Sequence, residues 1–274
     1  MNKRRTSSLS VLLILAFLLA ACSSGASSWE DEEFHETGTE RILSDDVNAL
    51  WTLSDAEASG TEAVQRIRLE TRKRDGQPIE NFDLNHEKLL HLMVVSKDLS
   101  YFNHIHPYYK GGGVFEIDNA FPAGGEYRLV ADFKPAEGDA MTKMAWIRVP
   151  GEPADPVPVV PDESLEKTAD GLRAGLTIDR LSPNADTTLA FTLSDAATGQ
   201  PIRDLQPYLG AIGHVVILSE DGERYVHVHA EEGQGSGPEA VFSASFPGSG
   251  IYKIWGQFQR NDRVTTFSYV VRVP

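Results

Sequence analysis

The sequence predicts an all-β protein of two tandem immunoglobulin-like β-sandwich domains, and two observations support this prediction. The first is an internal duplication, because "DGQPIENFDLNHEKLLHLMVVSKDLSYFNHIHP" from Asp75 aligns without a gap to "TGQPIRDLQPYLGAIGHVVILSEDGERYVHVHA" from Thr198. The second is a series of short apolar or alternating runs, punctuated by Gly, Pro, Asp and Asn, with no long stretch of helical period. About seven such runs in roughly 100 residues are typical of an immunoglobulin-like sandwich.

The duplication continues to the end of each copy. The segment "FPAGGEYRLVADF" (121–133) matches "FPGSGIYKIWGQF" (246–258), and the copies close on the strand-like runs "MAWIRVP" and "SYVVRVP". In both copies a glycine-containing turn precedes a tyrosine that begins a core-facing run. The chain therefore uses one structural unit twice.

The first residues, "MNKRRTSSLSVLLILAFLLAAC", combine a basic leader with a short apolar run and small residues before Cys22. This pattern predicts a signal peptide over residues 1–21 rather than a membrane-spanning helix. The order Leu-Ala-Ala-Cys resembles the lipobox of bacterial lipoproteins. The resemblance implies cleavage before Cys22, lipidation of its thiol, and an extracytoplasmic protein anchored to membrane lipid of the bacterial cell. The alternative is an ordinary secreted protein with a chance cysteine.

The remaining chain divides by composition. A polar, acidic segment reads as a flexible tether, and a proline-rich segment, "VPGEPADPVPVVPDES", reads as a semi-rigid linker. The predicted order is tether 22–48, first sandwich 49–149, linker 150–165 and second sandwich 166–274.

Composition excludes several classes of function. Cys22 is the single cysteine, so the chain forms no internal disulfide and no thiolate metal site. The net charge is −15, and the predicted leader holds only positive charges, so the processed chain is more acidic still. Such a surface argues against nucleic acid as a partner. No serine lies in a strand–turn–helix elbow and no other catalytic set is recognisable, so we expect a non-enzyme.

Six of the eight histidines fall on a repeated His-x12-His-x-His spacing. Asp221-Gly222 predicts a tight two-residue turn, and residues two apart share one face of a strand. In the first copy this register pairs His91 with His106 and Met93 with His104. In the second copy it pairs His214 with His229. Each copy should therefore gather three imidazoles on one face, from the sets His91, His104, His106 and His214, His227, His229.

Three neutral imidazoles with an open fourth position suit copper or zinc, and copper binds more tightly at equal availability. Met93 could add a soft ligand for Cu⁺. Because protonated imidazole cannot ligate, such a metal should be released between roughly pH 6.5 and 5. The histidines could instead be packing residues, and two separate sites or one shared site are both compatible with the linker.

The segment "HLMVVSKDLSYFNHIHP" resembles a motif of small extracytoplasmic bacterial proteins with YtkA-like, heavy-metal-binding domains, whose sandwich is similar to that of CopC-type copper proteins. The resemblance implies metal handling at the cell surface by the six repeated histidines. CopC-type sites also use a free N-terminal histidine, which a lipidated Cys22 would exclude here. The predicted function is metal sequestration or delivery to a transporter or another metalloprotein. The alternative is a structural or ligand-recognition module of the cell surface.

Overall fold

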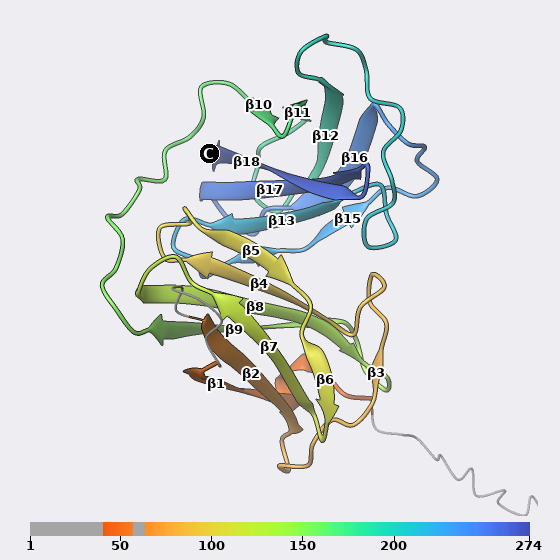
Figure 1. Ribbon diagram of the computed structural model, residues 1–274. Coiled ribbons are helices and arrows are strands. Elements are labelled where there is room, and N and C mark those ends of the chain that lie inside the picture. Colours follow the sequence, from red (N-terminus) through yellow and green to blue (C-terminus); the bar gives the residue numbers. More distant parts are fainter. Residues whose placement is uncertain (1–40, 57–63) are drawn as a thin grey trace, which may run out of the picture. The chain divides into compact units, whose positions relative to one another are not determined.

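The computed structural model describes residues 41–56 and 64–274, in which the regular elements are β-strands and one short 3-10 helix, Ser44–Asp46 (Figure 1). The predicted signal peptide, Cys22 and most of the predicted tether lie outside the described residues. None of the helices in the described part is long and apolar enough to cross a membrane.

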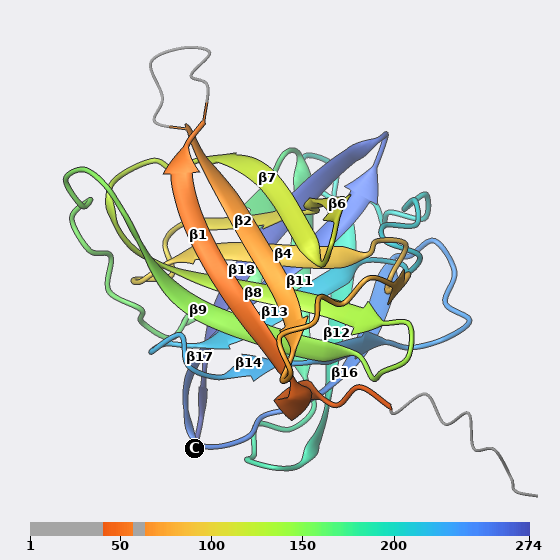
Figure 2. The same cartoon turned by 90° about the horizontal axis from the view of Figure 1, so that it is seen from below.

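The first sandwich contains nine strands in two sheets (Figure 2). One sheet has the order β1-β2-β7-β6, and the other has the order β3-β8-β4-β5 with β9 also paired to β8. The strands are β1 (Val47–Asp55), β2 (Val64–Lys73), β3 (Phe82–Asp83), β4 (Leu90–Ser96), β5 (Phe102–Ile105), β6 (Tyr108–Gly111), β7 (Val114–Ala120), β8 (Gly125–Pro135) and β9 (Met141–Val149).

The second sandwich repeats this plan. One sheet has the order β10-β11-β12-β16-β15 and the other has the order β14-β13-β17-β18. The strands are β10 (Glu166–Ala169), β11 (Leu172–Ile178), β12 (Asp186–Asp195), β13 (His214–Ser219), β14 (Tyr225–Val226), β15 (Val228–Ala230), β16 (Glu239–Ser245), β17 (Gly250–Arg260) and β18 (Arg263–Val273). The predicted fold class, an all-β protein of two immunoglobulin-like sandwiches, is confirmed.

Each sandwich has its own apolar core between its two sheets. The repeated tyrosines, Tyr127 and Tyr252, are buried at the start of β8 and β17. Their hydroxyls donate to the carbonyls of Ala123 and Gly248, each over 2.8 Å. A tyrosine that bonds back to the backbone a few residues upstream is typical of immunoglobulin-like domains.

Strands β4 and β13 are buried on both faces, which explains why their sequences are apolar without alternation. Leu92 and Val94 point into the core of the first sandwich. Met93 and Val95 point the other way, into a third apolar cluster that also contains Trp255 of the second sandwich. The sheets that carry β4 and β13 therefore face each other, as Figure 1 shows.

Two contacts across this interface have equivalent donors and acceptors that lie at the tips of equivalent hairpins. Arg128 of β8 donates to Glu223 of the second sandwich over 2.9 Å. Lys253, which the duplication aligns with Arg128, donates to the carbonyl of Leu99 in the first sandwich over 2.8 Å. Reciprocal contacts are what an approximate two-fold axis produces. The two copies thus pack like the halves of a dimer.

The first sandwich begins earlier than the sequence predicts. Ile42 and Val47 belong to the predicted tether but are buried in the first core. The Ile42 N–H donates to the carbonyl of Glu137 over 2.9 Å. The two apolar residues stand among acidic and polar neighbours, so composition alone hides them. The proline-rich segment holds to the first sandwich as well, because the Val157 N–H donates to Asp98 over 2.8 Å.

The hairpins that carry the histidines share a turn that differs from the predicted one. Both are closed by a four-residue loop rather than a two-residue turn, with Ser96 N–H donating to Tyr101 over 3.1 Å in the first copy. The Asp98 carboxylate accepts from the Ser96 hydroxyl and from the Ser100 N–H, and Asp221 makes the equivalent bonds in the second copy. Leu99 takes the left-handed conformation that Gly222 takes in the second copy.

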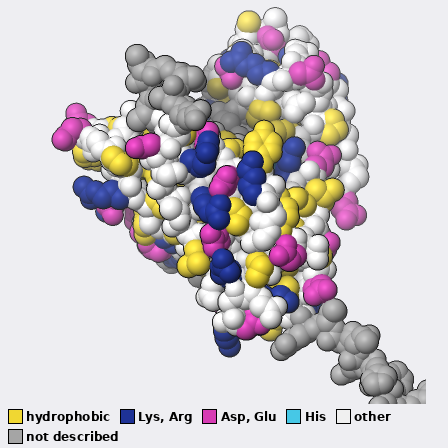
Figure 3. All heavy atoms as spheres, turned by 60° about the horizontal axis from the view of Figure 1, so that its bottom comes forward, with side chains coloured by type: hydrophobic (Ala, Val, Ile, Leu, Met, Phe, Trp, Pro, Cys, Tyr) yellow, Lys and Arg dark blue, Asp and Glu magenta, His cyan; other side chains and the backbone are white. Residues whose placement is uncertain are grey.

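The outer face of the β1-β2-β7 sheet is charged. Figure 3 shows Lys and Arg side chains interspersed with Asp and Glu on this side of the molecule. Arg66 pairs with Asp118 at 2.8 Å, and Arg68 pairs with Glu116 at 2.6 Å across neighbouring strands. Such cross-strand pairs describe a solvated sheet face rather than a binding surface.

Candidate metal centre

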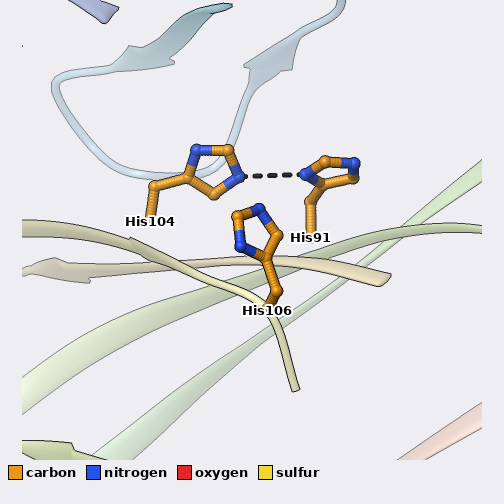
Figure 4. Close-up of side chains that lie close together, drawn as sticks. All are labelled: His91, His104 and His106. Carbon is orange, nitrogen blue, oxygen red and sulfur yellow. Dashed lines mark hydrogen bonds between the residues drawn. The ribbon is translucent and has the colours of Figure 1, made fainter. Parts of the chain in front are cut away.

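Three histidines of the first copy converge at the interface between the sandwiches, as Figure 4 shows. His91 lies on β4, His104 lies on β5, and His106 follows the end of β5. The ladder pairs Met93 with His104, which is the predicted register. His91 is two residues from Met93, so it projects on the same face as His104.

The three side chains are close enough to share one ion. One nitrogen from each lies within 4.8 Å of the others. The facing nitrogens, His91 Nδ1 and His104 Nε2, are 3.1 Å apart. Two nitrogens bound about 2.0 Å from a tetrahedral ion lie about 3.3 Å apart, so little movement is needed to accommodate a metal.

The hydrogen bonds at the far sides of the rings decide which nitrogens are free. His91 Nε2 lies 2.8 Å from the carbonyl oxygen of Asn85, which only accepts, so this nitrogen carries the proton. His104 Nδ1 lies 2.8 Å from the side-chain amide of Gln257, and the orientation of this amide sets the tautomer of His104. With the amide oxygen toward His104, the facing nitrogens of His91 and His104 both present lone pairs; with the amide nitrogen toward it, His104 Nε2 donates to His91 Nδ1. Orientation of a ligand imidazole by a carbonyl acceptor is typical of metal sites.

His106 adds a third uncommitted nitrogen. Its Nε2 is buried and makes no hydrogen bond within the described part of the chain. Its ring centroid lies 5.0 Å from that of His91 and 4.9 Å from that of His104. A buried nitrogen without a partner is unfavourable unless something binds it.

The environment keeps the three rings neutral. Burial, opposed in part by the hydrogen bond to Asn85, lowers the pKa of His91 to about 4. Burial also lowers the pKa of His104 to about 3 and that of His106 to about 4. Neutral imidazole is the form that ligates, so no proton has to leave at neutral pH.

Two further histidines line the cluster. His214, from β13 of the second sandwich, stacks on His104 with ring centroids 4.7 Å apart, and burial lowers its pKa well below the ordinary value. The His86 ring lies 6.1 Å from that of His91 and 6.0 Å from that of His214. The centre therefore contains side chains from both sandwiches.

The predicted second set of three does not form. His227 and His229 are neighbours, with ring centroids 4.5 Å apart, but His214 belongs to the first cluster. The predicted register holds for Ile217 with Val226, and then the chain crosses to the other sheet, where His229 pairs with Ser243. No second group of three such side chains in residues 41–56 and 64–274 is as close as the first.

The crossing explains the difference between the copies. In the first copy the ladder with β4 continues to Ile105, which keeps His104 inside it. In the second copy the ladder with β13 ends at Val226, so His227 lies at the crossing itself. Strand alternation predicts the register of a hairpin but does not predict where a strand leaves it.

Met93 takes no part in the cluster of nitrogens. It is fully buried in the apolar cluster between the sandwiches, beside Val95, Val130 and Trp255. Its place opposite His104 in the ladder is as predicted.

Sequence reasoning missed three residues of this region. His86 precedes the strand that carries His91, and Asp132 and Gln257 lie on the two strands that pair with β4 and β13. The duplication aligns Asp132 with Gln257, and each is a polar residue inside an apolar run, "YRLVADF" and "YKIWGQF". A polar residue at the same core-strand position of both copies was the available signal.

A family model described as "Domain of unknown function (DUF8832)" matches residues 44–151 and again residues 167–274. The chain belongs to this family. The two matches agree with the duplication in the sequence and with the two sandwiches. None of the curated proteins compared with the chain matches it.

Several solved structures resemble the DUF8832 chain in fold. The Escherichia coli adhesin FdeC is 16% identical, with 82% of this chain and 64% of that chain covered and a TM-score of 0.26. Invasin, a bacterial integrin-binding protein, is 12% identical over 81% of this chain and 39% of its own, with a TM-score of 0.23. A two-domain fibronectin type-III segment of chicken tenascin is 15% identical over 82% and 99%, with a TM-score of 0.24. The chain spans less than two thirds of the first two structures, and these similarities support no inference about function.

Proposed function

We propose that this protein binds a transition metal, copper first and zinc second, through His91, His104 and His106. The observation that carries the proposal is the convergence of three ring nitrogens, one from each histidine, within 4.8 Å of one another. His91 Nδ1 and His104 Nε2 face each other over 3.1 Å, and the Asn85 carbonyl accepts from His91 Nε2 on the far side of its ring. A cation bound between the rings would take the place of the contact of one ring with the other.

The donor set supports these two ions. Three imidazoles and no thiolate suit Zn²⁺ and Cu²⁺, and the order of divalent affinities favours copper. Three protein ligands leave one coordination position open, which favours exchange of the ion with a partner over permanent retention. We therefore propose sequestration or delivery to a metal transporter or another metalloprotein, without catalysis.

The location is part of the proposal. The basic and apolar leader followed by Cys22 supports export and a lipid anchor on the outer face of the bacterial membrane. The net charge of −15 supports attraction of cations and argues against nucleic acid.

The alternative is a structural or ligand-recognition module of the cell surface, in which the histidines only pack. A specific arrangement supports it. If the Gln257 amide turns its Nε2 toward His104, the polar groups form a continuous chain from Gln257 through His104 and His91 to the Asn85 carbonyl.

Metal titration of the purified full-length chain separates the two. We expect tight uptake of Cu²⁺ or Zn²⁺ that falls by one equivalent when His91 and His104 are both replaced by alanine. The matched control is His214→Phe, which keeps a ring stacked on His104 but has no nitrogen, and it should retain the metal. A double replacement that binds as many equivalents as the unaltered chain, or no uptake by the unaltered chain, would support the packing alternative.

A further inference from the structure

A carboxylate near the centre lacks the partners that burial demands. Asp132 of β8 is 5% exposed, and its Oδ1 has no hydrogen-bond partner among the described residues. Its Oδ2 lies 3.7 Å from His227 Nδ1, which is too far for a hydrogen bond. A buried charge in this state destabilises the folded protein unless a proton or a cation accompanies it.

The fold itself does not require an acid at this position. Gln257 is the aligned residue of the second copy, and both ends of its amide are bonded: Oε1 to His104 over 2.8 Å and Nε2 to Thr266 over 3.1 Å. The contact from Gln257 to His104 has its counterpart in the contact from Asp132 to His227. The amide at this position in the second copy thus has hydrogen-bond partners at both ends, whereas the carboxylate at the same position in the first copy does not.

One imidazole, His227, stands beside this carboxylate, and a second, His229, lies beside His227. His227 and His229 are both exposed, and their ring centroids lie 4.5 Å apart. The donor atoms of His227, His229 and Asp132 are not all within 4.8 Å of one another, in contrast to the first centre. An exposed histidine changes rotamer at little cost, so the set can close on an ion.

We propose that Asp132, His227 and His229 form a second site for a divalent transition metal, with one carboxylate and two imidazole ligands. This ligand set is harder than the three-imidazole centre and suits Zn²⁺ rather than Cu⁺. A cation here would bind the free oxygen of Asp132 and replace the missing hydrogen bonds. The proposal extends the function above but does not depend on it, because the two sites share no ligand.

Counting bound zinc tests the second site. The full-length chain, dialysed against Zn²⁺ and analysed for metal and protein, should hold two equivalents. Asp132→Asn, which has the same shape, should hold one equivalent. Because a ligand is lost, the affinity for the other equivalent should fall by more than about 100-fold, the loss that removal of a hydrogen-bond partner of a ligand causes. Asp118→Asn is the matched control on an exposed strand face and should hold two.

A second variant keeps the sites separate. The double replacement His91→Ala and His104→Ala removes the first centre and should leave one equivalent, which the further change Asp132→Asn should abolish. Retention of two equivalents by Asp132→Asn would overturn the second site. A triple variant, His91→Ala, His104→Ala and Asp132→Asn, that still holds one equivalent would overturn it as well. If Asp132→Asn fails to lower the zinc content, the second site is refuted and the first proposal stands. If the double variant binds as much zinc as the parent, the first proposal is refuted and the second site is still tested by Asp132→Asn.

Discussion

Replacing Asp132 by asparagine should make the metal-free protein more stable while it removes a metal site. The carboxylate is buried between the two sandwiches, and burial raises its pKa from 3.8 to about 7. Asparagine keeps the shape and cannot ionise. The substitution therefore removes the cost of holding a charge in this place.

The magnitude follows from the two pKa values. Below about pH 4 the carboxyl group is protonated in both the folded and the unfolded chain, so the variant and the parent should differ little in stability. As the pH rises from 3.8 toward about 7, the unfolded chain loses the proton first, and the parent loses stability. At about 1.36 kcal/mol per pKa unit, the difference reaches roughly 4 kcal/mol above pH 7. This value is an upper bound on the scale of the effect.

Denaturant unfolding in the presence of a chelator, from pH 4 to pH 8, measures this difference. The buried histidines act in the opposite sense: because the pKa of His91, for example, is lowered to about 4, acid destabilises the folded chain below about pH 6.5. That contribution is present in both proteins and cancels in the difference. Asp118→Asn is the control, because the guanidinium of Arg66 lowers the pKa of Asp118 and its replacement should be mildly destabilising.

A difference between Asp132→Asn and the parent that stays flat from pH 4 to pH 8 would refute the reasoning. So would a variant that is less stable than the parent at pH 8. Either result would mean that the charged carboxylate is already satisfied in the folded protein, by hydrogen-bond donors or by an ion that the chelator does not remove.

Three more predictions follow from the geometry. Gln257→Glu replaces the amide by a carboxylate that can only accept from His104, so the variant should retain the first metal in a titration. If the Gln257 amide instead donates to His104, as in the packing alternative, this substitution would break the hydrogen bonds that link Gln257, His104 and His91. Glu87→Gly should raise the free energy of unfolding by about 1 kcal/mol in a denaturant melt, because Glu87 takes a left-handed φ of 65° where the second copy has Gly210. Acid should release the first metal below about pH 5, later than an ordinary histidine site would, because the pKa values of His91 and His106 are lowered to about 4; metal content across a pH series measures this.

Sequence reasoning reached the first centre because its geometry is local. His91 and His104 lie on two strands joined by a short loop, and alternation places them on one face. The four-residue loop kept the predicted register although its chemistry differs, since the carboxylate of Asp98 orders the turn. The parts contributed by other elements, such as Gln257 and the stacked ring of His214, depend on the packing of two domains and leave no periodic signal.

The second copy shows where such reasoning stops. The run "HVVIL" indicates a strand that is buried on both faces. It does not indicate which part of the protein packs on the second face. The early crossing after Val226 separates His229 from His214, and it depends on pairing with β16 rather than on the hairpin itself. A distance of two residues along the chain decided which histidines meet.

The interface also shows how duplication can produce two chemically different positions from one. An approximate two-fold axis presents every interface residue twice, and identical copies would form two identical sites. Here one copy holds Gln257, which orients His104, and the other holds Asp132, which stands unsatisfied beside His227. A buried carboxylate costs stability in the metal-free fold, and a cation bound to its free oxygen would offset that cost.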